Sequence, residues 1–280
     1  MTFSIVARSA DGTSHGVAVA SKFLGVGAAV PAAQADVGAL ATQSYANLAY
    51  RPQGLALLAT GATAAGAVAG LTAADDGRAS RQLGVVGATG DGATFTGDAC
   101  HAWAGGVAGA GYAIQGNILI GPEVVAAMER AWLESAAETR LSRRLLAALR
   151  AGDEAGGDRR GRQSAALLVV ARGQGYGGTS DVVADLRVDD HADPLAELAR
   201  LLDLHTLYFD KPDPETLLDL VDELGDEVRG RLASLGHAGD DGVAGLDAAL
   251  AGWAGIENLE ERIVAGRIDP LVLARLRELS

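Results

Sequence analysis

Thr2 is the residue that could act as a nucleophile most directly, because it follows Met1 and begins the strand-forming run TFSIVA. Removal of Met1, which is usual when the next residue is small, would give Thr2 a free α-amino group. An α-amine has a pKa of about 8, so part of it is neutral at pH 7 and can accept the hydroxyl proton. We therefore predict Thr2 as a catalytic nucleophile that is activated by Met1 removal. The alternative is a β-branched residue that simply begins a strand.

Lys22 is the second candidate, because it follows Ser21 at the end of the strand-forming run GVAVAS. Only two of the 23 basic residues are lysines, Lys22 and Lys211. An ammonium group near the α-amine would lower the pKa of the amine and stabilise negative charge on a substrate oxygen. We predict that Lys22 supports Thr2 electrostatically, the alternative being a lysine retained by chance.

Further polar side chains gather where apolar strands end. They would line a cleft for a polar amide or carboxylate substrate, with an asparagine as oxyanion donor and an arginine as anion clamp. Alternatively they tie loops together, since buried polar groups need hydrogen-bond partners. Asn47 is predicted as a third catalytic residue. The predicted substrate-binding residues are Gln43, Ser44, Arg51, Gln115, Asn117, Asp158, Arg159, Gln163 and Ser164.

Metal and cofactor motifs are missing from the sequence. The five histidines have no metal-ligand spacing, and the glycine-rich stretches lack the Gly-Lys-Ser/Thr of a phosphate loop. Cys100 is the single cysteine, so no intramolecular disulfide can form, and we expect it to be a buried small side chain. We expect no cofactor and no metal.

The charge is divided unevenly along the chain. Residues 1–180 contain 14 Lys+Arg and 13 Asp+Glu, whereas residues 181–280 contain 9 and 23, which together give the net charge of −13. Such an acidic chain does not favour nucleic acid as a partner. The sequence has no apolar run of membrane-spanning length and no secretory pattern, so we expect no membrane association and a cytoplasmic location.

The order of predicted elements indicates an α+β layered sandwich rather than a parallel sheet, because the helices are grouped instead of alternating with strands. Strands are predicted at 2–7, 16–21, 36–43, 111–120, 163–173 and 180–190, with a hairpin over 81–97 that turns at 90–92. Helices are predicted at 54–61, at 63–76 with Thr63 as N-cap, and within 122–152. Acidic amphipathic helices follow at 193–209 and 212–236, and at least two short helices end the chain.

Seven segments in this order resemble the bacterial domain of unknown function 1028 family over residues 1–205. They are MTFSIVAR, GVAVASKF, VGALATQSYANLAYRPQGLALL, RQLGVV, TFTGDACHAWAG, YAIQGNIL and GDRRGRQSAALLVV. This family is grouped with the N-terminal nucleophile (Ntn) hydrolases. The resemblance implies a four-layer αββα sandwich whose first strand begins with the catalytic residue, and amide hydrolysis through an acyl-enzyme.

The C-terminal part resembles a small helical module described as peptidoglycan-binding. The segments LASLGHAGDDG and IDPLVLARLREL carry this resemblance. An acidic packing or oligomerisation module is the alternative. We place the domain boundary at residues 208–213, which gives a sandwich domain over 1–208 and an all-α module over 213–280.

Two functions follow from these predictions. The first is an Ntn-type amidohydrolase that cleaves a small amide or peptide-like metabolite through an acyl-enzyme on Thr2. The second is a non-catalytic scaffold that binds a peptide, a glycan or a partner subunit through its cleft or its tail. The apolar sheet edges and the tryptophan-bearing tail predict a homo-oligomer, with a dimer as the expected form.

Overall fold

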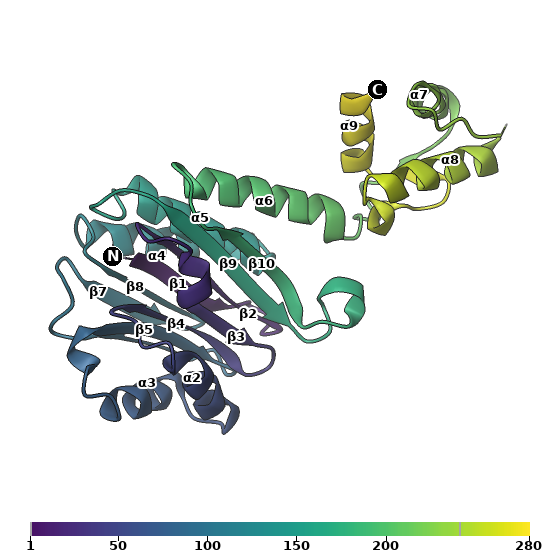
Figure 1. Cartoon of the computed structure of the whole chain (residues 1–280). Helices are drawn as coiled ribbons and strands as arrows, with labels where there is room; N and C mark the ends of the chain where they lie inside the picture. The colour runs from purple at the N-terminus through teal and green to yellow at the C-terminus, as the bar shows by residue number, and fades with distance from the viewer. Residues whose placement is uncertain (1, 241) are drawn as a thin grey trace. The chain divides into compact units, whose positions relative to one another are not determined.

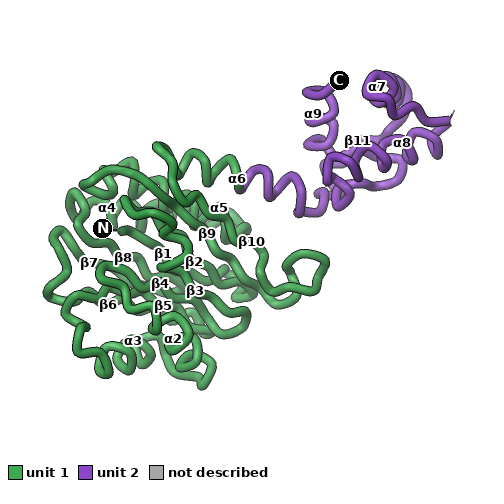
Figure 2. Tube along the Cα trace, viewed as in Figure 1, with its two compact units in different colours: residues 1–201 green, residues 202–280 purple. Residues whose placement is uncertain are grey.

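The computed structural model describes residues 2–240 and 242–280, so the predicted removal of Met1 concerns a residue outside the described ones. Figure 2 shows two compact units, residues 1–201 and residues 202–280. The division falls within helix α6 (Pro194–Phe209), before the boundary predicted at residues 208–213. Each unit is described by itself.

Unit 1 contains two antiparallel β-sheets (Figure 1). The six-stranded sheet has the order β10-β9-β2-β1-β8-β7, and the four-stranded sheet has the order β3-β4-β5-β6. The strands of the first sheet are β1 (Thr2–Arg8), β2 (Ser14–Ser21), β7 (Gly105–Gly109), β8 (Tyr112–Asn117), β9 (Ser164–Ala171) and β10 (Val182–Val188). The strands of the second are β3 (Pro31–Gln34), β4 (Gly38–Ser44), β5 (Arg81–Gly87) and β6 (Gly92–Thr96).

Helices cover the outer faces of the two sheets. Helix α5 packs on β1, β2 and β9 and helix α4 packs on β8, while α2 and α3 lie on β4 and β5 (Figure 1). The inner faces of the two sheets pack on each other through contacts of β1 with β4 and of β8 with β5. The helices are α1 (Val26–Ala29), α2 (Tyr50–Ala59), α3 (Ala64–Ala73), α4 (Glu123–Glu134) and α5 (Leu141–Glu154). The predicted α+β class with antiparallel sheets is confirmed.

The β1–β2 hairpin sets the position of Thr2. Its turn contains Asp11, whose carboxylate accepts hydrogen bonds from Ser9 and Thr13, and Gly12, whose φ of 80° suits glycine. The antiparallel register pairs Arg8 with His15 at the turn and Thr2 with Ser21 at the open end. The turn chemistry therefore fixes which side chains meet at the head of β1.

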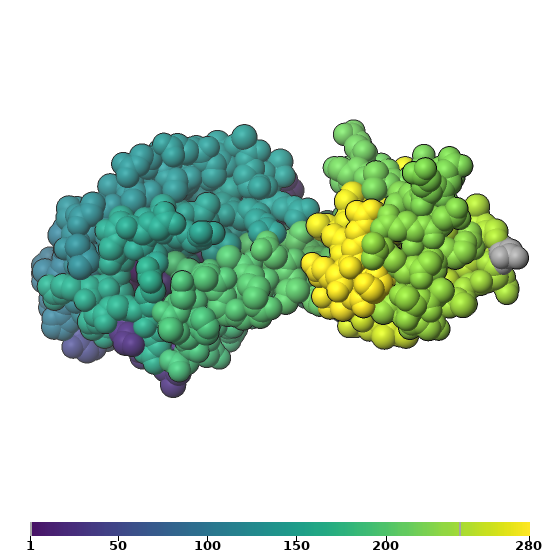
Figure 3. All heavy atoms as spheres, turned by 90° about the horizontal axis from the view of Figure 1, so that it is seen from above, coloured from purple at the N-terminus to yellow at the C-terminus, as the bar shows by residue number. Residues whose placement is uncertain are grey.

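Alternate residues of β1 serve two different layers, because successive side chains of a strand point to opposite faces. Phe3 lies against α5 at Gly152, where a glycine leaves room for the aromatic ring. Val6 belongs to the core between the sheets, together with Val17, Val19 and Val86. Both side chains are buried. On the face of the molecule that Figure 3 shows, the purple N-terminal segment is visible only in small patches.

Several local predictions are confirmed. Thr63 caps α3 by accepting a hydrogen bond from the amide of Gly66 at 3.0 Å. The hairpin of β5 and β6 turns where predicted, around Gly90. Strands β3 and β7 were not predicted, because β3 (PAAQ) and β7 (GGVAG) are short and, apart from Gln34 and Val107, contain only alanine, glycine and proline, which have little intrinsic strand preference.

The predicted helical segment at 122–152 forms two helices with a break over residues 135–140. Ser135 donates a hydrogen bond to the carbonyl of Trp132, and the guanidinium of Arg144 lies 3.7 Å from the centroid of the Trp132 ring. These contacts accompany the reversal of the chain, so that α4 and α5 pack against each other.

Unit 2 is a small helical body around one apolar core. Its buried core contains Trp253 together with Val228, Leu246 and Leu273. Arg262 and Asp269 form a buried ion pair at 2.6 Å, and Arg262 also donates to two backbone carbonyls. The elements are α7 (Asp222–Ser234), α8 (Val243–Ile256), α9 (Pro270–Leu279), β11 (Leu218–Asp219) and β12 (Arg267–Ile268).

The helix predicted at 212–236 begins later than expected, at Asp222. The carboxylate of Asp213 accepts a hydrogen bond from the amide of Glu215, which makes a turn after Pro212. Leu218 and Asp219 then pair with Ile268 and Arg267. This distant strand partner could not be read from the local pattern, so the prediction for residues 212–221 was wrong.

In the part of the chain that the structure describes, no helix combines the length and the apolar character that crossing a bilayer requires.

A buried histidine makes unit 1 sensitive to pH. His15 is 1% exposed, and neither ring nitrogen has a hydrogen-bond partner among the described residues. Burial lowers the pKa of His15, and the nearby charge of Arg8 lowers it further, while the adjacent backbone of Gly87 and the charge of Asp36 oppose these effects in part. The unfolded chain therefore binds a proton at a higher pH than the folded chain does.

We predict that the stability of unit 1 is fully present above pH 6.5 and falls as the pH decreases towards the lowered pKa of His15. The free energy of unfolding should decrease between pH 7 and pH 5, and this decrease should be smaller in His15→Leu. Hydrogen exchange of β1 and β2 peptides in urea would measure it. The exposed His191→Gln is the control, and an unchanged pH dependence in His15→Leu would contradict the prediction.

Candidate functional site

Four strands of the larger sheet end in polar residues that stand in one row. Thr2 is paired with Ser21 of β2 on one side and with Asn117 of β8 on the other. Ser21 is paired in turn with Ser164 of β9. All four residues are buried, with exposed fractions of 6% or less. Residues directly opposite in a sheet share a face, so this row forms one polar wall at the head of β1.

The hydroxyl of Thr2 is held from its neighbouring strand. Thr2 Oγ1 lies 3.0 Å from Ser21 Oγ, and either oxygen can donate this hydrogen bond. The carbonyl oxygen of Thr2 accepts from Gln43 Nε2 at 3.3 Å and from Asn117 Nδ2 at 3.4 Å. Both the side chain and the backbone of Thr2 are thereby fixed.

Gln82 links the two sheets behind Thr2. Its Oε1 accepts hydrogen bonds from Gln43 Nε2 and Asn117 Nδ2, each at 2.9 Å. Its Nε2 donates to the carbonyl of Gly116 at 2.7 Å and to Thr96 Oγ1 at 2.9 Å. Since Gln82 is fully buried, it holds both amides that contact the carbonyl of Thr2.

The hydrogen-bond network continues one layer deeper through Ser4. Ser4 Oγ donates to Gln43 Oε1 at 2.7 Å and accepts from Gln115 Nε2 at 2.6 Å. Gln115 Oε1 is buried and has no hydrogen-bond partner among the described residues. Beyond Ser4 the space between the sheets is filled by the apolar core around Val6. The polar groups are therefore confined to one end of the sandwich.

Two residues beside this network have left-handed backbone conformations. Ser44 (φ 69°) follows Gln43, and Ile118 (φ 51°) follows Asn117. This region is unfavourable for a β-branched residue such as isoleucine. Gln43 and Asn117, which bind the carbonyl of Thr2, are thus each followed by a residue with a left-handed backbone conformation. Strained backbone conformations of this kind cluster at functional sites.

Residues 158–162, which we call the strap, form hydrogen bonds with the residues that follow β2 and β8, the two strands on either side of β1. Asp158 Oδ2 accepts from the backbone amide of Lys22 at 2.8 Å, which anchors the strap beside the end of β2. Asp158 also forms a bridge with Leu119, and the amide of Arg159 donates to the carbonyl of Ile118 at 3.4 Å. Because Lys22 follows Ser21 and Ile118 follows Asn117, the strap passes the head of β1, where Thr2 stands.

The ammonium of Lys22 is not directed at Thr2. Lys22 is exposed, and its Nζ donates to the carbonyl of Arg162 in the strap at 3.2 Å. Ser164, next to the strap, donates to the carbonyl of Phe23 at 2.5 Å and accepts from the amide of Val26. Lys22 therefore lies at the rim of the site, with its ammonium bound to the strap, and its predicted electrostatic support of Thr2 stays a prediction.

Asn47 belongs to a different cluster, centred on Asp75. Asn47 Nδ2, the hydroxyl of Tyr50 and Nε of Arg81 all donate to Asp75 Oδ2, at 3.2, 2.8 and 2.9 Å. The hydrogen bond from Arg81 is the largest cause that lowers the pKa of Asp75, whereas burial raises the pKa of Tyr50 to about 12. Asn47 thus ties the loop between β4 and α2 to Asp75. This contact agrees with the alternative that these polar side chains tie loops together.

Two predicted binding residues also lie away from Thr2. Gln163 donates to Asp190 at 3.0 Å. Arg51 donates to the carbonyl of Ala28 at 2.6 Å and lines an open groove of about 490 Å³ with Leu48 and Arg187. Of the predicted site residues, the structure gathers Thr2, Gln43, Ser44, Gln115, Asn117, Asp158, Arg159, Ser164 and Lys22 around the head of β1.

Several contacts at this end were not predicted. Gln82, in the run RQLGVV, is the polar residue of an apolar strand, and that pattern could have identified it. Tyr45 and His101 meet at 3.2 Å between the tyrosine hydroxyl and Nε2, and the carbonyl of His101 accepts from the amide of Ile118. No local signal joins Tyr45 to His101, because 56 residues separate them.

Across residues 2–240 and 242–280, no three His, Cys, Asp or Glu side chains gather in a way that could hold a metal ion.

The fold and this site define an α+β sandwich protein with a polar wall at the head of its first strand, followed by a helical module. The model of the family of unknown function DUF1028 matches residues 2–198, and the chain belongs to this family. This match confirms the resemblance seen in the sequence. A second model, described as "Putative peptidoglycan binding domain", matches residues 208–276.

The comparison with solved structures gives a similar relative. The crystal structure of protein SPO2555 from Silicibacter pomeroyi, also matched by DUF1028, is 30% identical in sequence. The similarity covers 81% of this chain and 92% of that chain, with a TM-score of 0.66. No curated protein matches the chain.

We predict that Gln82→Leu destabilises unit 1 by about 2–4 kcal/mol, because it leaves the amides of Gln43 and Asn117 without their shared acceptor. Urea unfolding of the full chain, followed by hydrogen exchange of β1, would measure the change. Gln53→Leu, on the exposed side of α2, is the matched control. A loss below about 0.5 kcal/mol in Gln82→Leu would show that the network does not hold the head of β1.

Proposed function

We propose that the protein is an N-terminal nucleophile amidohydrolase and that its sandwich is of the four-layer αββα type of that superfamily. The observation that carries the proposal is the place of Thr2, whose hydroxyl lies 3.0 Å from Ser21 Oγ at the head of a central strand. Its carbonyl is held by two amides that Gln82 fixes in turn. Such rigid mounting is what a nucleophile at the start of a chain requires.

The reaction would begin once Met1 is removed. The neutral α-amine of Thr2 takes the proton of its own hydroxyl while Oγ1 attacks the carbonyl carbon of the amide. The C–N bond then breaks, the amine product leaves with that proton, and an ester on Thr2 remains. Water, deprotonated by the same amine, hydrolyses the ester and returns the proton to Oγ1.

The neighbouring residues would act as positioning groups. Asn117 and Gln43 already use their amide nitrogens on the carbonyl of Thr2 and on Gln82, so they orient the nucleophile rather than bind an oxyanion. Ser21 orients the hydroxyl of Thr2. Lys22, whose ammonium faces the strap, belongs to substrate binding rather than to the activation of the amine.

A second candidate function is binding without catalysis. The match of residues 208–276 to a peptidoglycan-binding description supports binding of a glycan by the helical module. In that case the sandwich would be a scaffold, and Thr2 would begin a strand without reacting. This candidate would be favoured if substitution of Thr2 changed none of the measured activities.

We predict that Thr2→Ala lowers turnover of a responsive amide by at least about 1,000-fold, while Thr2→Ser keeps measurable turnover. A panel of aminocoumarin amides, screened with the full chain, would provide the substrate. Thr139→Ala, at an exposed threonine between α4 and α5, is the matched control and should behave as wild type. The thermal transition of Thr2→Ala should remain close to that of wild type.

Equal turnover in wild type and Thr2→Ala would remove the proposal. A loss of activity accompanied by unfolding would not support it, so the comparison uses only variants whose melting curves match.

A further inference from the structure

Lys22 and Arg159 flank the head of β1, and among the described residues neither forms an ion pair with a carboxylate. We propose that the substrate is an amide that carries a carboxylate, and that Lys22 and Arg159 bind this carboxylate from the two sides of Thr2. This inference rests on the proposed function, because it assigns the substrate class of the same site. The proposed carboxylate binding involves Lys22 and Arg159 at the rim of the site, whereas the proposed catalysis involves Thr2 in the buried wall behind them.

Lys22 stands on the β2 side of Thr2. It directly follows Ser21, which is paired with Thr2 and lies 3.0 Å from the hydroxyl of Thr2. Its backbone amide is fixed by Asp158, and its ammonium donates to the carbonyl of Arg162 at 3.2 Å. The ammonium has two further donors, because a lysine carries three. The ammonium of Lys22 can therefore bind an anion while it keeps its hydrogen bond to the carbonyl of Arg162.

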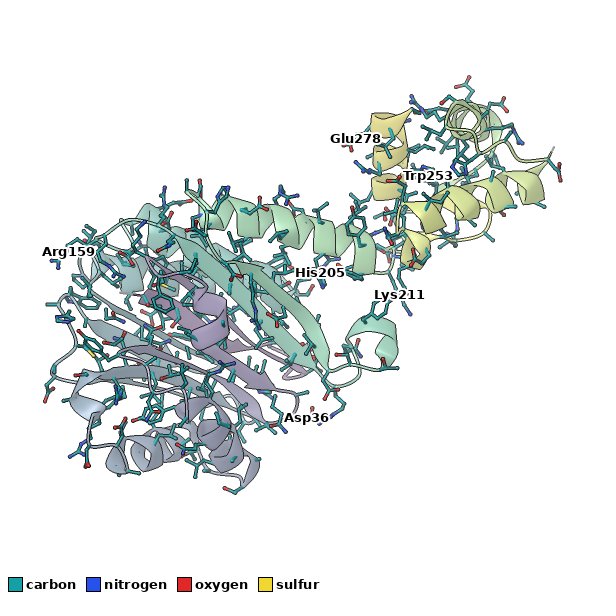
Figure 4. All side chains as sticks on the ribbon, in the orientation of Figure 1. Asp36, Arg159, His205, Lys211, Trp253 and Glu278 are labelled. Atoms are coloured by element: carbon teal, nitrogen blue, oxygen red, sulfur yellow. The ribbon has the colours of Figure 1, made fainter. Side chains whose placement is uncertain are left out.

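Arg159 stands on the β8 side. Its backbone amide donates to the carbonyl of Ile118, the residue after Asn117, and Asn117 is the other strand partner of Thr2. The side chain is exposed and has no hydrogen bond or ion pair among the described residues. Figure 4 shows Arg159 at the same end of the sandwich as the N mark of Figure 1, directed outward from the ribbon.

Two carboxylates near the strap, those of Asp158 and Asp153, form ion pairs with neither Lys22 nor Arg159. Asp158 accepts from the backbone amides of Lys22 and Arg160 and pairs with the Arg160 guanidinium at 3.4 Å. Asp153 pairs with Arg162 at 2.8 Å. Both of these carboxylates are therefore engaged by the backbone or by an arginine other than Arg159.

The strap concentrates positive charge in a part of the chain that is otherwise nearly neutral. Residues 1–180 contain 14 Lys+Arg and 13 Asp+Glu. Three of these arginines lie within the five residues of the strap, beside the head of β1. Amides built from amino acids or dicarboxylic acids carry a carboxylate, which an arginine and a lysine can bind together.

Binding can be measured separately from turnover in the Thr2→Ala full chain. Isothermal titration calorimetry would compare glutaryl anilide with pentananilide, which has the same acyl length and no charge. N-pentanoyl-4-aminobenzoate places the carboxylate on the amine side and shows from which side it is bound. We expect one carboxylate ligand to bind about 5–10-fold tighter than pentananilide at 50 mM salt, with less preference at 500 mM.

Adding Arg159→Ala or Lys22→Ala should abolish this preference, whereas Arg150→Ala, at an exposed arginine of α5, should keep it. If this pattern is found and wild type releases no aniline, the inference stands and the proposed hydrolysis fails. If neither carboxylate ligand binds better than pentananilide, or none binds at millimolar concentration, the inference is overturned even where wild type hydrolyses neutral amides.

Discussion

The burial of amide and hydroxyl groups between two sheets is the constraint on which this structure depends. A buried polar group without a partner costs more free energy than a typical hydrogen bond contributes, so Thr2, Gln43, Gln82 and Asn117 are arranged to satisfy one another. They do so only if β1, β4, β5 and β8 keep their register. The hydrogen bonds that stabilise this end of the sandwich therefore also fix the position of Thr2.

The division of the inner layer into an apolar part and a polar part follows from the same constraint. Val6, Val17 and Val19 fill the space towards the hairpin turn, where apolar side chains pack between the two sheets. Towards the open strand ends, polar side chains replace them, and the chain leaves β4 and β8 through the left-handed residues Ser44 and Ile118. An apolar core thus supports a polar, hydrogen-bonded end of the sandwich.

The sequence predicted what is local and missed what is distant. The strand-forming runs at 2–7 and 16–21, the turn at 90–92 and the Thr63 cap each act within a few residues, and these predictions were confirmed. Asn47 could not be separated from Asn117 by pattern, because both follow strand-forming segments, and only the fold directs one to Asp75 and the other to Thr2. The strap contact between Asp158 and Lys22 spans 136 residues and had no local signal.

The central claim is that Thr2 carries both the nucleophile and its base, and the mass of the intact native protein tests it most directly. The account predicts a chain that is lighter than the full sequence by one methionine, with Thr2 as its first residue. A protein that quantitatively retains Met1, or that has further residues before it, would contradict the account, because the α-amine would then belong to another residue.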